Sequence, residues 1–365
     1  MKINHASATM SSRNRVLKTF NFEKTDRVPI DYFSNPTIHG KLAIELGVTD
    51  GDYEKVLQAL GVDFRGLHHP NYIGPELFKK IPGTNVNPLY GFYSKWIENE
   101  FGGYDDFCIY PLKDASDEEI ANFPVPNPDH FDYEEKLNSL NKYNDLAVYV
   151  GNGGFADNIN SLGRVMGMEN ALVNLMTEDE ATMTYVRNKA KMELEILERL
   201  IVGGKGRIDF MWIGEDLGSQ HSPMISLDMY RRVLRPIHQK YIDLAKAYNL
   251  PVMIHTCGSS SWAYEDFIDM GINAVDTLQP EATNMSPEYL KKTFGGRLSF
   301  HGCISTAGPL AYGSTDEVVA DVKEKLEIMM PGGGYHFSPT HSIQDNSPVE
   351  NIIAMYQAAH DLGSY

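Results

Sequence analysis

Short apolar runs separated by long helical patterns are the feature of this sequence that most restricts its fold. Eight runs are rich in apolar or β-branched residues and are bounded by Gly, Pro or Asn, as β-strands are. They are Arg27 to Ser34, Val62 to Leu67, Leu146 to Val150, Ile208 to Gly214, Pro251 to Thr256, Ala274 to Leu278, Leu298 to Gly302 and Tyr335 to Ser338. Strands that alternate with helices form parallel sheets with right-handed crossovers. We therefore expect an α/β protein, a (β/α)8 TIM barrel.

The helical patterns between these runs support this order. Apolar residues recur at helical spacing over Leu227 to Tyr248 and Thr315 to Met330, and Ser226 and Ser314 precede them as caps. The last helix should begin near Pro348. An open, doubly wound sheet is the alternative, but no G-x-G-x-x-G turn follows the first strand.

Residues 71–144, after the second strand, are too long for one βα unit and are expected to be an insertion in a single 1–365 barrel domain. The segment begins at Asn71, continues through an aromatic-rich stretch and a linker with several prolines, and ends at Asn144. The aromatic residues are Tyr90, Phe92, Tyr93, Trp96, Phe101, Tyr104, Phe107 and Tyr110. We expect a β-hairpin here near the barrel mouth, which either shapes that mouth or only packs on the surface.

Charge and hydropathy exclude several classes of partner. The chain has 32 Lys and Arg against 49 Asp and Glu, a formal net charge of −17. Such a surface repels nucleic-acid phosphates and anionic lipid. No apolar run approaches the roughly 20 residues of a membrane span, and Met1 to Asn14 lack an apolar signal core. We expect a cytoplasmic protein that binds neither nucleic acid nor a membrane.

Residues that bind metals or move protons follow several of the predicted strands. Because active sites of such barrels lie at the C-terminal ends of the strands, these residues should converge. They are Glu215 and Asp216 after the fourth strand, His255 and Cys257 at the fifth, Cys303 after the seventh and His341 after the eighth. His and Cys are the preferred ligands of zinc, and a catalytic zinc keeps one position open. The set predicts a zinc site.

Each part of this set also has a purely structural interpretation. Residues two apart at a strand end point the same way, so His255 and Cys257 can share one ion, or the histidine can bond a neighbouring strand while the thiols pack. Glu215 and Asp216 can orient a ligand or act as acid or base. Alternatively, they are an acidic pair at a helix N-terminus.

Several short motifs are spread over nearly the whole chain. They are Arg13, Arg15, Val16 and Leu17, then Asp26-Arg27-Val28-Pro29, His255-Thr256-Cys257-Gly258, Gly302, Gly313 to Val318, Gly332 to Tyr335, and Pro348-Val349-Glu350-Asn351. In their order and spacing these motifs resemble those of the uroporphyrinogen decarboxylase superfamily. The resemblance implies a (β/α)8 barrel and one of two chemistries.

The first chemistry is metal-free decarboxylation of a tetrapyrrole with four acetate arms. The decarboxylases carry an early Met-Arg-Gln-Ala-Gly-Arg stretch whose arginines bind the substrate carboxylates. The matching region here, Asp31 to Pro36, has no Arg. A polyanionic substrate without bidentate arginine partners would be held poorly, and the net charge points the same way.

The second chemistry is that of zinc methyltransferases, which exchange methyl groups with a separate corrinoid (cobalamin) protein. They include methylcobamide:coenzyme M and O-demethylase methyltransferases. Their H-x-C pair matches His255 and Cys257. Their third ligand is a Cys about seven residues before the final Pro-x-Glu-Asn, where this chain has His341. The resemblance implies that either His341 or Cys303 completes the zinc site, and that Glu215 or Asp216 orients the donor or joins the ligands.

The resemblance favours the methyltransferase interpretation. The methyl group would move between a small methylated compound, such as a methoxyarene, or a thiol and the corrinoid protein. Zinc would polarise the leaving oxygen or lower the pKa of the thiol. The remaining alternatives are the tetrapyrrole carboxy-lyase and a non-catalytic barrel that binds a corrinoid or a small molecule. The sequence leaves the donor, acceptor, direction of transfer and oligomeric state open.

Overall fold

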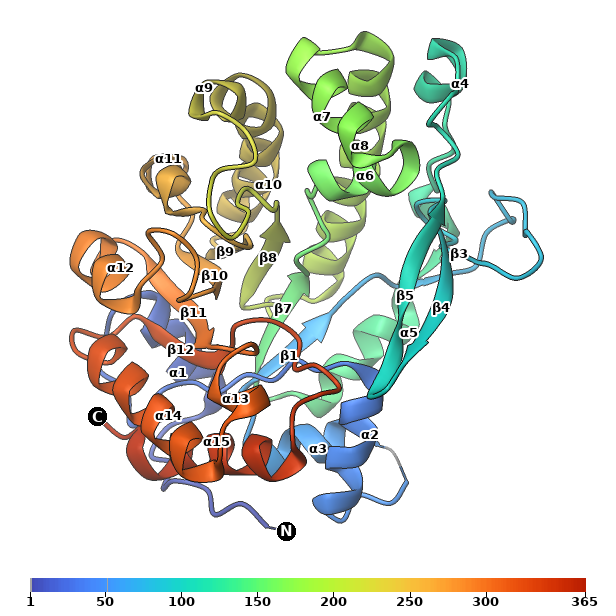
Figure 1. The fold of residues 1–365 in the computed structure, drawn as a ribbon. Coiled ribbons are helices and arrows are strands. Elements are labelled where there is room, and N and C mark those ends of the chain that lie inside the picture. Colours follow the sequence, from blue (N-terminus) through green and yellow to red (C-terminus); the bar gives the residue numbers. More distant parts are fainter. Residues whose placement is uncertain (1, 51) are drawn as a thin grey trace.

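A parallel β-sheet forms the centre of the molecule, with helices outside it (Figure 1). The computed structural model describes residues 2–50 and 52–365. In sheet order, the strands are β1 (Phe64–Leu67), β7 (Ala147–Gly151), β8 (Phe210–Gly214), β9 (Val252–His255), β10 (Ala274–Leu278), β11 (Ser299–Ile304) and β12 (Tyr335–Pro339). Every neighbouring pair is parallel. The α/β barrel architecture predicted from the sequence is confirmed, and seven of the eight expected strands form where they were expected.

The first expected strand, Arg27 to Ser34, is an extended segment rather than a regular strand. On one side the amide of Asp31 donates to Phe337 of β12 at 2.9 Å. On the other side the amide of Asp63, just before β1, donates to Ile30 at 2.8 Å. The segment thus lies between the two edge strands. Pro29 has no N–H to donate, which limits the pairing to isolated bridges.

Helices follow the strands as the periodicity predicted. The α-helices are α1 (Ser12–Phe20), α2 (Pro36–Glu45), α3 (Tyr53–Leu60), α4 (Asp117–Ala121), α5 (Tyr133–Asn138), α6 (Ile159–Met166), α7 (Met168–Thr177), α8 (Glu180–Gly203), α9 (Leu227–Met229), α10 (Arg235–Ala247), α11 (Tyr264–Met270), α12 (Pro287–Phe294), α13 (Pro309–Tyr312), α14 (Thr315–Met329) and α15 (Val349–Leu362). Short 3₁₀ turns are η1 (Pro128–His130), η2 (Ser139–Lys142) and η4 (Ser261–Ala263), and η3 (Tyr230–Leu234) is a π-turn.

Ser caps fix where the two clearest helices begin. Ser314 and Glu317 form a reciprocal capping box at the start of α14. Ser226 accepts a hydrogen bond from the amide of Met229 at the start of α9. The pattern expected as one helix from Leu227 to Tyr248 is interrupted by η3 before it continues as α10. No helix in the described part of the chain has the length and apolar character to cross a membrane.

The chain between β1 and β7 holds the expected β-hairpin. The hairpin strands are β4 (Tyr93–Asn99) and β5 (Gly102–Ile109), and β3 (Asn85–Val86) pairs with β4. A second small sheet joins β2 (Asn71–Tyr72) to β6 (Phe131–Asp132). The hairpin lies at the outer edge of the molecule (teal in Figure 1).

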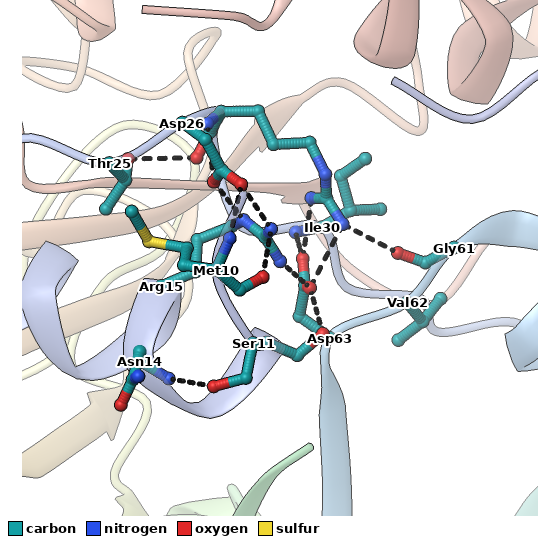
Figure 2. Close-up of polar contacts among 12 residues, drawn as sticks. Met10, Ser11, Asn14, Arg15, Thr25, Asp26, Ile30, Gly61, Val62 and Asp63 are labelled. Carbon is teal, nitrogen blue, oxygen red and sulfur yellow. Dashed lines mark hydrogen bonds and ion pairs between the residues drawn. The ribbon is translucent and has the colours of Figure 1, made fainter. Parts of the chain in front are cut away.

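A buried ion-pair network joins three segments near the N-terminal ends of the strands. Asp63 is fully buried and accepts hydrogen bonds from Arg15 and Arg27, each at 2.7 Å, and from the amide of Ile30 at 2.8 Å. Arg15 also bonds Asp26 through two nitrogens. Figure 2 shows Arg15 between the two carboxylates. The early Arg and Asp-Arg motifs of the sequence therefore anchor α1 and the extended segment to β1.

Candidate metal centre

Three potential metal ligands converge at the C-terminal ends of the strands. His255 ends β9, Cys257 follows two residues later, and His341 lies two residues after β12. One ligand atom from each lies within 4.8 Å of the others. The Sγ of Cys257 is 3.4 Å from Nε2 of His255. The expectation that residues two apart at this strand end face the same point is met for this pair.

The donor chemistry of this group fits a zinc ion. Two imidazoles and one thiol are the ligand types that zinc prefers, and three protein ligands leave one position open. Within the described residues, neither ring nitrogen of His341 has a hydrogen-bond partner in the protein. Burial and the neighbouring His255 lower the pKa of His341. A neutral imidazole is the form that binds a metal.

A buried carboxylate orients His255. Nδ1 of His255 is 2.7 Å from Asp276 on β10, which leaves Nε2 facing Cys257. Metal-bound histidines usually donate their second ring nitrogen to such a carboxylate, which fixes the tautomer and the ring orientation. Despite complete burial, the pKa of Asp276 is lowered by His301 and His255. The charged form of Asp276 is thus favoured.

The same carboxylate continues into a buried polar chain. Asp276 lies 2.6 Å from Nδ1 of His301, and Nε2 of His301 lies 3.2 Å from Asp31. Burial alone would lower the pKa of His301, but Asp276 and Asp31 raise it to about 9. The imidazolium of His301 therefore holds two carboxylates in place behind the candidate ligands.

Glu215 and Asp216, adjacent in sequence, have different surroundings. Glu215 is fully buried and accepts hydrogen bonds from the amides of Asn158 and Ile159, at the first turn of α6, and lies 3.1 Å from His238. It is a cap for α6, so the expectation of a catalytic role does not fit its position.

Asp216 does lie at the metal centre. One of its oxygens accepts from the amide of Cys257 at 2.8 Å and is 3.7 Å from Nε2 of His255. Burial opposes ionisation, but His255 and the hydrogen bond from Cys257 lower the pKa of Asp216. A charged carboxylate is therefore available beside the three ligands.

Cys303, the alternative third ligand, is not part of the group. It is 1% exposed, and the charged residues that act on its thiol include Lys325 and Asp321 of α14, outside the sheet. Gly302 and Cys303 both have positive φ, 112° and 82°. Such a backbone breaks the alternation of β11, so Cys303 does not point where His301 points. The structure corrects this expectation in favour of His341.

Close contact between two loops shapes the floor of the centre. Gly258 has φ +70°, and a side chain there would lie 2.4 Å from the carbonyl oxygen of Gly218. A side chain at Gly153 would lie 2.9 Å from the ring of His255. Only glycine allows the turn at Gly258 and this close approach of the backbones.

A cavity of about 560 Å³ opens beside the centre, and His255 and His341 line it together with Asp276 and Thr277. Its aromatic lining is Tyr32, Phe33, Tyr53, Phe64, Tyr143, Tyr149 and Trp212. This is the size of a small-molecule site. None of the aromatic residues from Tyr90 to Tyr110 lines the cavity. Of the two expectations for the hairpin, the one in which its aromatic residues shape the site is therefore not met.

Sequence reasoning missed Asp276, Tyr149 and Trp212. All three lie within runs that were expected only to form strands. Asp276 carried a signal, because a carboxylate inside an otherwise apolar buried strand needs a charged partner. Tyr149 and Trp212 carried none, since aromatic residues are common in buried strands.

A comparison with a solved structure agrees with the fold. A methyltransferase from Methanosarcina mazei superposes with a TM-score of 0.67 at 16% identity, over 96% of this chain and 99% of that one. D-psicose 3-epimerase, solved in the presence of D-fructose, and the catalytic domain of β-amylase from Paenibacillus polymyxa both reach only 0.36, at 16% and 11% identity. They cover 69% and 98% of this chain, and 83% and 97% of their own. No curated protein sequence matches the chain.

A family model identifies the relationship. The model described as uroporphyrinogen decarboxylase (URO-D) matches residues 163–362, more than half of the chain, and this region includes all three candidate ligands. The motifs from His255 to Asn351 lie within the matched region, whereas the early Arg and Asp-Arg motifs lie outside it. The chain belongs to the uroporphyrinogen decarboxylase family.

Proposed function

We propose that this protein is a zinc-dependent methyltransferase that works with a separate corrinoid protein in the cytoplasm. His255, Cys257 and His341 would hold the zinc. The observation that carries the proposal is that their ligand atoms lie within 4.8 Å of one another, at the wall of a cavity large enough for a small molecule. The overall likeness to a protein named a methyltransferase supports it.

The residues around the ligands have defined tasks in this proposal. Asp276 holds His255 with Nε2 facing Cys257, and His301 in turn holds Asp276. Asp216 holds the backbone at Cys257 and keeps a negative charge beside the site. Zinc bound here would supply Lewis acidity to an oxygen or sulfur atom of the substrate at its open position. The aromatic walls exclude water from the methyl group.

The cavity does not suit the polyanionic substrate of the metal-free decarboxylases. Among the described residues that line it, Arg65 is the only Lys or Arg. Both Nε and Nη2 of Arg65 bond Glu54, at 2.7 and 2.8 Å. Asp31 and Asp276 add negative charge to the lining. Four acetate groups would find no free guanidinium, so tetrapyrrole decarboxylation is disfavoured.

Methyl transfer to free cob(I)alamin tests the proposal. The purified protein, with and without added zinc, is incubated with methoxylated aromatics, methylamines and methyl thioethers, and methylcobalamin is followed by its absorption. We expect transfer from at least one class, lost on chelation and in Cys257→Ala. Uroporphyrinogen turnover that is insensitive to chelators would contradict the proposal. Ligand binding without any turnover, unaffected by Cys257→Ala, would instead identify a non-catalytic barrel.

A further inference from the structure

A second pair of polar side chains, His68 and Tyr149, faces the cavity that the metal centre borders. His68 follows β1 directly, and Tyr149 lies on the neighbouring strand β7. Their ring centroids are 5.8 Å apart. Neither residue belongs to the group of candidate metal ligands.

Gly66 lets both of these rings pack directly against the backbone of β1. It is paired with Tyr149 in the sheet register. A Cβ built on Gly66 would lie 2.6 Å from Cε1 of His68 and 2.7 Å from the hydroxyl oxygen of Tyr149. His68 and Tyr149 therefore lie against the same point of β1, which puts both side chains close together at the edge of the cavity.

The hydrogen-bonding state of His68 follows from its neighbour. Nδ1 of His68 is 3.3 Å from the carbonyl oxygen of Gly151. A carbonyl only accepts, so Nδ1 carries the proton. Desolvation lowers the pKa of His68, so the ring is neutral near pH 7. Its Nε2 therefore presents a lone pair that can accept a hydrogen bond from a ligand in the cavity.

Tyr149 offers the complementary group. The residue is 4% exposed, and it lines the cavity. Burial raises the pKa of Tyr149 well above its usual value, so the hydroxyl stays protonated and can donate. Because Tyr149 lines the cavity and its hydroxyl is not sealed in the core, a ligand in the cavity can reach it.

We propose that His68 and Tyr149 together bind a hydroxyl group of the substrate, which donates to Nε2 of His68 and accepts from Tyr149. A hydroxyl can do both, whereas an ether or a carboxylate has no proton for His68. The rings of Tyr149, Trp212 and Phe33 contact one another in series, with centroids 5.0 and 5.2 Å apart. This apolar wall suits a ring or chain that bears the hydroxyl.

This inference rests on the proposed function, because it takes the methyl donor to bind in the cavity beside the three ligands. The substrate class is thus a hydroxylated methyl compound. Its hydroxyl would be held between β1 and β7 while its methyl group faces the metal centre. His68 and Tyr149 are specificity-determining residues in this account.

Calorimetric binding of two matched probes to the metal-free protein tests the pair. The probes are 2-methoxyphenol and methoxybenzene, which differ by one hydroxyl. We expect the wild-type protein to bind 2-methoxyphenol about tenfold more tightly, the effect of two net hydrogen bonds. Tyr149→Phe and His68→Phe should each lose most of this preference while retaining affinity for methoxybenzene. Equal affinity of the wild-type protein for both probes, or no binding of either, would overturn the inference.

Tyr185→Phe is the matched control. It removes a hydroxyl from a buried tyrosine of α8 that does not line the cavity, so the preference should stay. If the preference survived in both Tyr149→Phe and His68→Phe, the inference would be wrong. The probes are measured without metal, so the two proposals can fail separately. If the wild-type protein preferred 2-methoxyphenol but bound no zinc, the proposed function would be rejected and the hydroxyl site would stand.

Discussion

The carboxylate of Asp276 lies 2.7 Å from Nδ1 of His255, one strand away in the sheet. This contact decides which nitrogen of His255 faces Cys257. It also makes Asp276 the link between the candidate ligands and the buried His301. The geometry of the candidate ligands thus depends on a residue outside the ligand group.

Asp276→Asn should weaken zinc binding about 10- to 100-fold, the usual effect of losing a supporting carboxylate. The amide can still accept a hydrogen bond but lacks the charge that favours the bound ring. Competition with a chromophoric chelator measures the dissociation constant. Asp228→Asn, at a side chain that is 90% exposed, is the control. An unchanged zinc affinity in Asp276→Asn would show that Asp276 does not support the site.

Glu215→Gln should lower stability and leave zinc content unchanged. Glu215 accepts from the backbone amides of Asn158 and Ile159, where α6 begins, and from the Asn158 side chain. An amide side chain has only one acceptor oxygen, so at least one buried donor loses its partner, at a cost of about 1–3 kcal/mol. Urea unfolding gives the change in stability, and elemental analysis gives the zinc. Loss of zinc from a fully stable variant would instead place Glu215 in the metal centre.

Much of the fold and of the candidate metal centre could be predicted from the sequence, and the exceptions have physical causes. Strand positions are predictable because short apolar runs end at Gly, Pro or Asn. His255 and Cys257 are predictable as a pair because a strand end places residues two apart on one side. Cys303 breaks that rule through the positive φ values at Gly302 and Cys303, which the letters alone do not reveal.

Two things are harder to predict from a single sequence. One is the separate roles of residues that are neighbours in the sequence, and the other is contacts between residues on different strands. Glu215 and Asp216 follow the same strand, yet one caps α6 and the other reaches Cys257. The contact between Asp276 and His255 spans 21 positions, and that between Asp276 and His301 spans 25. Such pairs depend on the register of neighbouring strands. The hydrophobic pattern shows which face of the sheet a side chain lies on, but not which residue of the next strand it contacts.

Asp63→Asn should destabilise the fold strongly. The substitution leaves the buried guanidinium groups of Arg15 and Arg27 with one charged partner fewer. Breaking a buried ion pair in this way costs about 3–5 kcal/mol. The midpoint of urea unfolding measures the loss. A change below about 1 kcal/mol, the value for an exposed pair, would show that the network of Figure 2 contributes little.

The same network should make the protein sensitive to acid. Burial opposes ionisation, but Arg27 and Arg15 lower the pKa of Asp63, and Arg15 lowers that of Asp26. Because both pKa values are lower in the folded state, the stabilisation is complete above the unfolded value of about 3.9. It is lost as the pH falls from there through the folded values. Unfolding followed from pH 6 to pH 2 should show this decline, and Asp63→Asn should flatten it. A decline of equal slope in the variant would contradict the assignment.

Zinc content per chain, measured on four matched proteins, tests the central claim most directly. The proteins are the wild type, Cys257→Ala, His341→Ala and Cys303→Ala, each loaded with zinc, freed of excess metal and analysed by mass spectrometry. We predict about one zinc per chain in the wild type and in Cys303→Ala, and a large loss in Cys257→Ala and His341→Ala. Equal zinc in all four proteins, or zinc lost only from Cys303→Ala, would contradict a centre built from His255, Cys257 and His341.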